Sequence, residues 1–355
     1  MAERYPPMPP RDPNPPYKRI AAEEAWIAPN IAARYVEEIR SGGIDDPGFH
    51  TMWGFFAGDS PQARDHARRI QSLGEERIAD MDNSGIDIQV VSLGSPGVQI
   101  FSADEATALA RDANDQLAEG IAANPDRLVG LAAFSPLDPA NAAKELERGV
   151  RKLDLRGAIL NSHTLGTYLD DEQYWEIFEA AEALDVPVYL HPNTPSKQMI
   201  EPFLKRGLDA AVYGFACETG LHALRLIVSG LFDRFPKLQV VLGHCGEALP
   251  YWLYRIDFMH TRLSKAGRYE HVKPLKRHAW DYLIDNFHYT SSGVGWAPPV
   301  KFVQEVIGVE RMMYAMDYPW QFVPGEVGVF DAMDVDDAAK KAFFENNARR
   351  VFRIT

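Results

Sequence analysis

The chain alternates between short hydrophobic runs and longer amphipathic segments. Eight of the hydrophobic runs have the length and composition of buried β-strands, and they span residues 19–23, 86–93, 128–134, 157–161, 186–191, 238–244, 287–291 and 312–317. Most are almost wholly apolar, as expected for parallel strands that are covered on both faces. Because helical segments lie between them, this order predicts an α/β fold, a (β/α)8 barrel of the TIM type.

Two of the segments between strands show a clear helical period. Residues 103–127 and 170–185 each place apolar side chains on one stripe and begin with acidic residues, which favour a helix N-terminus. The expected buried stripes are Ala106, Ala110, Ala113, Leu117 and Ile121 in the first segment, and Trp175, Phe178, Ala181 and Leu184 in the second.

Two connections are too long to be plain crossovers between strands. Residues 27–71 are rich in glycine and aromatic side chains and follow the first strand, and residues 192–219 follow the fifth. Both leave the barrel end at which such folds carry their active sites, so we expect long loop insertions that form lids or walls of a pocket.

The N-terminus has a composition of its own. Seven prolines between Pro6 and Pro16 exclude a helix and predict an extended arm over residues 1–17, either solvated or lying across a neighbouring subunit. Residues 18–355 contain no internal repeat and no second boundary, so we expect one barrel domain there.

Charge and composition limit the partners. The formal net charge is −13 and the pI is near 5.3, without a long basic stretch, which argues against nucleic acid or an anionic membrane as a general partner. The N-terminus lacks the apolar core of a signal peptide, and no uncharged run reaches the roughly 18 residues that span a bilayer. Two cysteines, Cys217 and Cys245, are too few for a disulfide framework. These features predict a cytoplasmic protein.

Ionisable residues stand where several of the predicted strands end. They are Glu23, His191, His244 and Asp317, and in a closed parallel sheet they would converge. Carboxylates and imidazoles that converge indicate a metal site. Two carboxylates with one histidine form a harder ligand set than the histidine-rich sites of zinc, which favours manganese or magnesium. Glu247, three residues after His244, could orient that imidazole toward a water or a substrate oxygen.

Arginines and aromatic side chains occur in the same connections. Arg64 and Arg255 are candidate clamps for a substrate carboxylate; the alternative is an ordinary ion pair with Asp59 or Asp257. Aromatic residues that suit a flat ring, or simply belong to the core, are Trp53, Phe55, Phe56, Tyr213, Phe215, Trp296, Tyr318, Trp320 and Phe322.

An ordered series of motifs covers nearly all of the chain after the arm. It comprises AAEEAW, WGFFAGDSPQAR, LGEERIADMDNSGIDIQVVSLGSPGVQ, LNSHTLGTYLD, GFACETG, GHCGEALPYWLYR and YAMDYPW. With these motifs the chain resembles the metal-dependent aromatic acid decarboxylases of the amidohydrolase superfamily. That family replaces the usual first-strand His-x-His by Glu-x-His or Glu-x-Ala, and Glu23, Glu24 and Ala25 have the Glu-x-Ala form.

The resemblance implies roles for individual residues. It implies that Glu23, His191 and Asp317 bind a divalent metal, expected to be Mn²⁺ rather than Mg²⁺ or Zn²⁺, with Asp317, His244 and Glu247 as catalytic groups. The substrate-binding residues that it implies are Arg64, Arg255, Phe215, Trp320 and Gly94. Arg255 would act in its own site or in that of a neighbouring subunit. Gly94 and Trp320 replace a threonine and a tyrosine of a close relative, which suggests a differently substituted substrate.

The expected activity is therefore that of a carboxy-lyase without an organic cofactor. It would convert an ortho-hydroxy aromatic carboxylate, 5-carboxyvanillate or a close analogue, to the phenol and CO₂ in the catabolism of lignin-derived aromatic compounds, as a homodimer or higher homo-oligomer. One alternative is a metal-dependent hydrolase or hydratase of a small carboxylated substrate on the same barrel. Another is an inactive barrel that serves as a binding or assembly protein.

Overall fold

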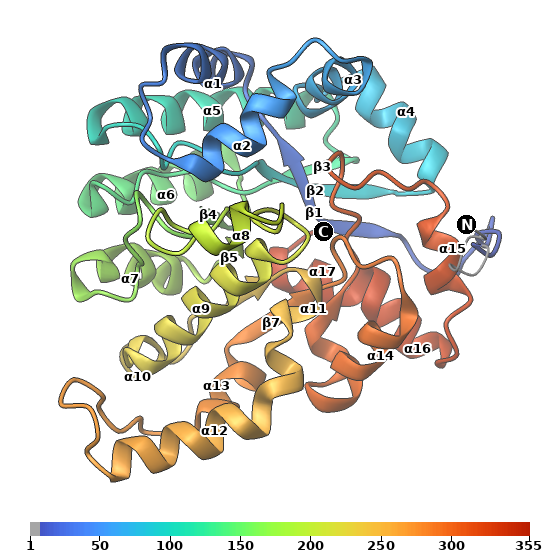
Figure 1. Cartoon of the computed structure of the whole chain (residues 1–355). Coiled ribbons are helices and arrows are strands. Elements are labelled where there is room, and N and C mark those ends of the chain that lie inside the picture. Colours follow the sequence, from blue (N-terminus) through green and yellow to red (C-terminus); the bar gives the residue numbers. More distant parts are fainter. Residues whose placement is uncertain (1–7) are drawn as a thin grey trace.

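Eight parallel strands form a closed barrel in the computed structural model, which describes residues 8–355 (Figure 1). The strands are β1 (Ile20–Trp26), β2 (Ile88–Leu93), β3 (Leu128–Gly130), β4 (Ala158–Asn161), β5 (Val188–His191), β6 (Val240–Leu242), β7 (Phe287–Thr290) and β8 (Met312–Met313). They pair in order from β1 to β3 and from β4 to β8. A bridge between Ala132 and Ala158 joins the two groups, and the Ala22 amide donates to the carbonyl of Tyr314 at 2.9 Å, which closes the circle. The barrel prediction is confirmed.

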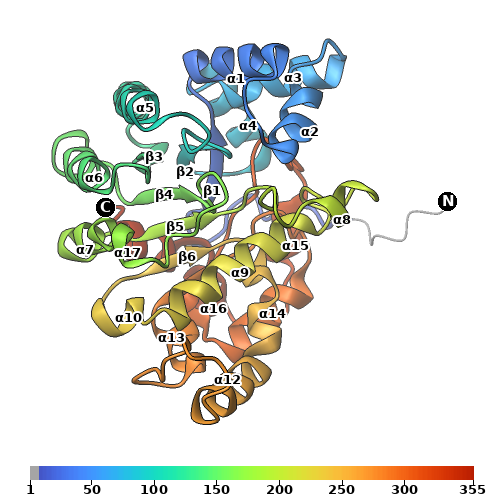
Figure 2. The same cartoon turned by 60° about the vertical axis from the view of Figure 1, so that its left-hand side comes forward.

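Helices surround the barrel (Figure 2). They are α1 (Pro29–Ser41), α2 (Pro47–Phe56), α3 (Pro61–Ile70), α4 (Glu75–Ser84), α5 (Ala103–Ala123), α6 (Pro139–Leu153), α7 (Trp175–Leu184), α8 (Glu201–Leu204), α9 (Gly214–Val228), α10 (Leu231–Arg234), α11 (His244–Glu247), α12 (Leu249–Lys265), α13 (Ala279–Asp285), α14 (Ala297–Val306), α15 (Glu326–Asp331), α16 (Asp337–Lys341) and α17 (Asn347–Phe352). Short 3₁₀ turns cover Glu172–Tyr174 and Val309–Arg311, and Ala342–Asn346 form a π-helical turn.

The helix α5 shows how the sequence pattern produces this layer. Asp104 and Glu105 lie in its first turn, and the predicted stripe packs inward: Ala106, Ala110, Ala113 and Leu117 are buried. In α7, Phe178 and Ala181 are buried, while Trp175 and Leu184 are half-buried. The helices α5, α6 and α7 pack against one another in a row (Figure 1).

The connection after β1 is helical rather than a long loop. It forms α1, α2 and α3, and each begins with a proline at its first turn. Asp46 and Ser60 cap α2 and α3, because their side chains accept hydrogen bonds from amides of the first turn. Glycines and aromatics in this stretch suggested a loop, but the caps define helices. The connection after β5 contains only the single turn α8 before α9 begins.

The described part of the proline-rich arm lies on its own barrel. Residues 8–17 contain no helix or strand, the Asp12 amide donates to Asp331 at 2.8 Å, and the Tyr17 ring stacks on Phe344 at 5.0 Å. Residues 1–7 of the predicted arm are outside the described residues, and a domain boundary at residue 17 remains a prediction.

Within residues 8–355 no helix has the length and apolar character that crossing a bilayer would require. Cys217 and Cys245 are both free thiols.

Candidate metal centre

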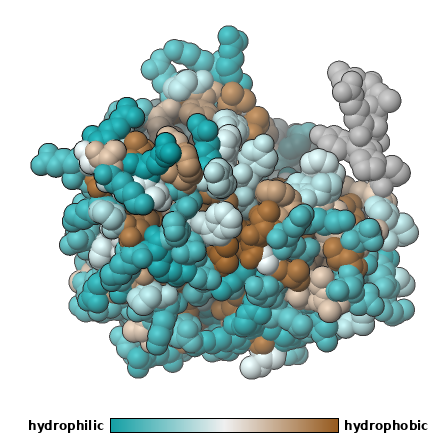
Figure 3. All heavy atoms as spheres, turned by 90° about the horizontal axis from the view of Figure 1, so that it is seen from below, coloured by the Kyte–Doolittle hydropathy of each residue, from teal (hydrophilic) through white to brown (hydrophobic). Residues whose placement is uncertain are grey.

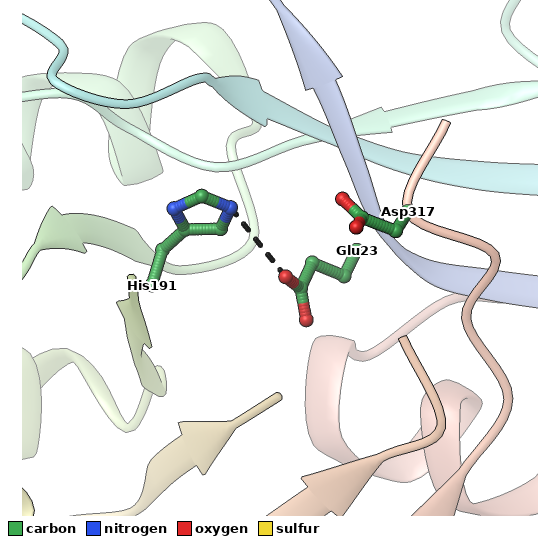
Figure 4. Close-up of side chains that lie close together, drawn as sticks. All are labelled: Glu23, His191 and Asp317. Carbon is green, nitrogen blue, oxygen red and sulfur yellow. Dashed lines mark ion pairs between the residues drawn. The ribbon is translucent and has the colours of Figure 1, made fainter. Parts of the chain in front are cut away.

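Three side chains from distant parts of the sequence meet at one end of the barrel. One ligand atom from each of Glu23, His191 and Asp317 lies within 4.8 Å of the others, and Nε2 of His191 is 3.4 Å from Oε1 of Glu23 (Figure 4). Their convergence was predicted, but their positions in the strands were not all correct. His191 is the last residue of β5, whereas Glu23 lies in the middle of β1 and Asp317 lies four residues beyond β8.

The Glu23 carboxylate has one occupied and one free oxygen. Its Oε2 accepts hydrogen bonds from the hydroxyl of Tyr189 and from that of Thr290, the latter at 3.1 Å. Its Oε1 is buried and has no hydrogen-bond partner among residues 8–355. A buried oxygen without a donor is costly unless a cation takes its place, so the free oxygen fits a metal ligand.

His191 is prepared for the same role. Its Nδ1 lies 2.9 Å from the carbonyl of Pro192, and donation to this carbonyl leaves the lone pair of Nε2 directed at Glu23. Burial lowers the pKa of His191 below its ordinary value, although the Glu23 carboxylate opposes this shift. The imidazole is therefore neutral near pH 7, which is the form that binds a metal.

Asp317 has an unusual backbone and an unusual acidity. Its φ of +73° lies in the left-handed region, which is rare for residues other than glycine. Burial raises the pKa of Asp317 well above its ordinary value; the carboxylates of Glu23 and Glu247 add to this shift, whereas His244 opposes it. Burial thus favours the protonated form of this carboxyl, whereas a bound cation would favour the ionised form.

His244 lies beside the three donors in a turn of left-handed backbone. Residues 244–248 all have positive φ, between 50° and 80°. This turn lets Nδ1 of His244 bond to Oε1 of Glu247 at 2.8 Å, while its Nε2 lies 4.0 Å from both Glu23 Oε1 and Asp317 Oδ2. Burial would lower the pKa of His244, but Glu247 and Glu23 together raise it to about 10. The predicted His244–Glu247 pair is present.

The two arginines do not join this cluster. Arg64 on α3 and Arg255 on α12 are both exposed, and in the described part of the chain no carboxylate lies within 4.0 Å of either guanidinium. The alternative ion pairs with Asp59 and Asp257 are therefore not formed, and Asp257 instead pairs with His278 at 3.1 Å. Both guanidinium groups remain available to a ligand or to a second chain.

Some of the predicted aromatic residues gather around Trp320. Its ring lies 4.3 Å from that of His66, 4.9 Å from Phe56 and 6.0 Å from Trp53, measured between centroids. Phe215 is half-buried at the start of α9. The others divide between surface and core: Phe55, Tyr213 and Trp296 are exposed, Tyr318 is buried, and Phe322 packs on Tyr318.

Gly94 lies next to Trp320, which sequence reasoning did not show. A Cβ atom at Gly94 would lie 3.3 Å from Cβ of Ala25 and 3.7 Å from Nε1 of Trp320. Ala25 is the residue at which the related first-strand motif carries histidine. Gly94 and Trp320, the two departures from a close relative, are thus neighbours in space, and Ala25 lies beside Gly94.

Sequence reasoning also missed Glu24. This residue was only the middle position of the Glu-x-Ala motif, yet it is fully buried and accepts hydrogen bonds from the amides of Met316 and Tyr318. The one indication in the sequence was a second acidic residue, next to Glu23, in a strand that was predicted to be buried.

A parallel (β/α)8 barrel with a cluster of carboxylates and imidazoles at one end is the arrangement of a metal-dependent barrel enzyme. The model of the amidohydrolase family (Amidohydro_2) matches residues 45–354, and the chain belongs to this family.

Several proteins that are similar to this chain are decarboxylases. The crystal structure of a 5-carboxyvanillate decarboxylase from Novosphingobium aromaticivorans, complexed with manganese and 4-hydroxy-3-methoxy-5-nitrobenzoic acid, is 48% identical, covers 96% of this chain and 97% of that chain, and has a TM-score of 0.93. The corresponding enzyme of Sphingomonas paucimobilis is 40% identical over 95% of this chain and 99% of its own, with a TM-score of 0.90. A gamma-resorcylate decarboxylase of Polaromonas is 36% identical, and the match covers 83% of this chain and 91% of that protein.

Proposed function

We propose that this protein is a metal-dependent, non-oxidative decarboxylase of aromatic acids. The observation that carries the proposal is the cluster of Glu23, His191 and Asp317, in which the buried Oε1 of Glu23 has no donor among the described residues. Structurally similar decarboxylases were crystallised with manganese. Two carboxylates and one neutral imidazole suit Mn²⁺, and Ala25 removes the histidine that would make the set more favourable for zinc.

The reaction adds a proton to the ring carbon that bears the carboxylate and then breaks the bond from this carbon to the carboxylate. The electron pair of that bond returns to the ring and restores aromaticity, and CO₂ leaves. An ortho oxygen supports the first step by supplying electron density to the ring. A divalent ion held by Glu23, His191 and Asp317 would supply positive charge that orients and neutralises the anionic substrate oxygens.

Asp317 is the proposed general acid. Because a bound cation would favour its ionised form, Asp317 would take up the proton of the substrate phenol as the substrate binds, and would then deliver this proton to the ring carbon. His244 lies 4.0 Å from the Asp317 carboxylate and is paired with Glu247, so the two can hold a neighbouring substrate oxygen or return the proton. Removing His244 and Glu247 separately would distinguish these roles from that of Asp317.

The proposed substrate is an ortho-hydroxy aromatic carboxylate, 5-carboxyvanillate or a close analogue. The ligand of the Novosphingobium structure carries its nitro group next to a phenol hydroxyl, the place where such a substrate has its carboxylate. Trp320 and Phe215 are proposed to contact the ring, with Arg64 as a carboxylate clamp. Because Gly94 and Trp320 are neighbours, they would set the ring substituents together.

We further propose that a second copy of the chain covers the face around α12. Aromatic side chains are exposed there, with Tyr251 and Tyr254 about 70% exposed and Trp252 47%. Figure 3 views the molecule from the side on which α12 lies in Figure 1 and shows hydrophobic side chains among the hydrophilic ones. Arg255 lies on this helix, so a homodimer would bring its guanidinium to the partner.

Hybrid dimers test whether Arg255 acts across this interface. Mixing Arg255→Ala subunits with Asp317→Asn subunits restores one intact site in each hybrid if Arg255 acts in the partner's site, which gives about a quarter of wild-type activity after random exchange. No recovery would show that Arg255 acts in its own subunit. A monomer in sedimentation at assay concentration would contradict the dimer.

The decisive assay for the function compares decarboxylation with the rival hydrolase or hydratase activity. The Mn²⁺-loaded protein should release CO₂ from 5-carboxyvanillate or another ortho-hydroxybenzoate and should not hydrolyse a panel of lactones. Protein treated with a chelator is the control. Lactone hydrolysis without CO₂ release from any phenolic acid would overturn the proposal, and no activity with any substrate together with no bound metal would support a binding protein.

A further inference from the structure

Glu24 is a completely buried carboxylate directly behind the metal-binding cluster. Its exposed fraction is 0%, and it follows Glu23 in β1. The two neighbouring carboxylates contact different surroundings, as expected for successive residues of a strand. Glu23 bonds to Tyr189 and Thr290, whereas Glu24 bonds to the segment that contains Asp317.

Each oxygen of Glu24 accepts one backbone amide beside Asp317. Oε1 accepts from the amide of Met316 at 3.0 Å, and Oε2 accepts from the amide of Tyr318 at 3.0 Å. These two amides flank the metal-binding residue on either side. The carboxylate therefore holds the chain immediately before and immediately after Asp317.

The local backbone explains why a side chain, rather than a backbone carbonyl, accepts hydrogen bonds from these two amides. Strand β8 ends at Met313, and Asp317 has a φ of +73°, so the segment between Tyr314 and Tyr318 does not continue as a regular strand beside β1. The amide of Ala25 still donates to the carbonyl of Tyr318 at 2.7 Å. The register of β1 against β2 also shifts between Ala21 and Glu24. Within residues 8–355 no backbone carbonyl accepts the amides of Met316 or Tyr318. Buried amides need an acceptor, and the Glu24 carboxylate supplies one for both.

A second buried charge supports Glu24 from behind. Gln89 approaches Oε2 of Glu24 at 3.5 Å, and Nη1 of Arg77 donates to Oε1 of Gln89 at 2.9 Å. Arg77 is itself fully buried, donates to the carbonyl of Ala25 at 2.7 Å, and lies 4.7 Å from the centre of the Tyr318 ring. The carboxylate is thus balanced by a guanidinium that also holds β1 and Tyr318.

We propose that Glu24 is a positioning residue that fixes Asp317 in its left-handed conformation and so sets the geometry of the metal site. Among the described residues the Glu24 side chain forms no hydrogen bond with Glu23 or His191, and in this proposal it takes no part in proton transfer. The inference depends on the proposed metal site, but it does not require that the reaction be a decarboxylation.

The test is the affinity of the purified protein for Mn²⁺, measured without substrate. In Glu24→Gln the side chain keeps its shape, but an NH₂ group replaces one acceptor and faces a backbone amide. We expect the Mn²⁺ dissociation constant to rise about tenfold to hundredfold, as found when partners of metal ligands are removed. The zero-field splitting in the Mn²⁺ EPR spectrum should change as well, because the Asp317 ligand is displaced.

Glu145→Gln is the matched control. Glu145 is also a buried carboxylate, but it lies on α6 and bonds to Asn114 and Arg148, away from the metal cluster. The control should keep the wild-type dissociation constant and EPR spectrum even if both variants lose thermal stability. Equal losses of Mn²⁺ affinity in the two variants would show a general structural effect and overturn the inference.

A double-mutant cycle with Asp317→Ala, which removes the third ligand, isolates the connection. If Glu24 acts through Asp317, adding Glu24→Gln to Asp317→Ala should weaken binding by less than about threefold. Full additivity would overturn the inference, as would wild-type affinity in Glu24→Gln. If Glu24→Gln does not fold, Glu24→Asp keeps the charge but is too short to reach both amides, and wild-type affinity there would be equally decisive. A protein that binds Mn²⁺ as expected but releases no CO₂ would refute the proposed function alone.

Discussion

Gly246 offers a sharp test of the left-handed turn that carries His244 and Glu247. Its φ is +80°, and a Cβ atom at this position would lie 2.6 Å from Cδ1 of Tyr289 and 2.9 Å from Cδ of Pro250. Tyr289 cannot easily move aside, because its ring is fully buried and its hydroxyl donates to the carbonyl of Leu283 at 2.5 Å. Gly246→Ala should therefore strain the backbone and the packing at once.

The two contributions can be given magnitudes. A left-handed conformation costs a residue with a Cβ about 1–2 kcal/mol. Overpacking a rigid core typically costs a further 1–3 kcal/mol. The free energy of unfolding should therefore fall by about 2–5 kcal/mol in Gly246→Ala.

Gly42→Ala separates the two terms. Gly42 has a similar φ of +68°, but no atom lies within 4 Å of the position that a Cβ atom would take there. Gly42→Ala should therefore show only the cost of the left-handed backbone. Urea unfolding of both variants, with a chelator present to remove the contribution of metal binding, should show Gly246→Ala less stable than Gly42→Ala by about 1–3 kcal/mol. The kcat for decarboxylation should fall only in Gly246→Ala, since only there are His244 and Glu247 displaced. Equal stability losses in the two variants, or an unchanged kcat, would refute this account of the turn.

Three other predictions concern the metal, the acid and the pH dependence of stability. Chelation should abolish activity and lower Tm, and Mn²⁺ at 100 times its Kd should restore about 2.7 kcal/mol of stability, whereas no recovery on adding Mn²⁺ would count against the site. Asp317→Asn should bind Mn²⁺ in equilibrium dialysis but release no CO₂, and wild-type turnover would contradict its role as the acid. Burial lowers the pKa of His222 to about 3, so below pH 6.5 the unfolded chain takes up a proton at this residue that the folded chain does not, and this group alone lowers stability by about 2 kcal/mol between pH 8 and pH 5. Urea unfolding at both pH values should show this loss reduced in His222→Gln; an identical loss in both proteins would contradict it.

The arrangement of the barrel could be predicted because it follows from side-chain chemistry along the strands. Runs such as residues 157–161 and 186–191 are apolar enough to indicate buried parallel strands, and their order defines the (β/α)8 topology. Convergence of Glu23, His191 and Asp317 then follows from the topology alone. This convergence does not depend on the exact residue at which a strand ends. The prediction was therefore correct, although of the three residues only His191 is the last residue of a strand.

The parts that were missed depend on backbone geometry that residue types do not determine. Strand β8 comprises only two residues because the chain turns away to place Asp317 at a positive φ, and nothing in the apolar run of residues 312–316 indicates this. The roles of Glu24 and Arg77 follow from the same departure. In the connection after β1, prolines and caps at Asp46 and Ser60 outweighed the glycines that suggested a loop.

The closure between β1 and the segment after β8 has a consequence for the order of events in the cell. Glu24 and Tyr318, which bond across this closure, are 294 positions apart. At typical translation rates, about 15 to 60 s separate the synthesis of the two residues. A nascent chain therefore carries Glu23 and His191 well before Asp317 has been synthesised. The three predicted metal ligands are together only in the finished protein, so discrimination between competing metal ions can occur only there.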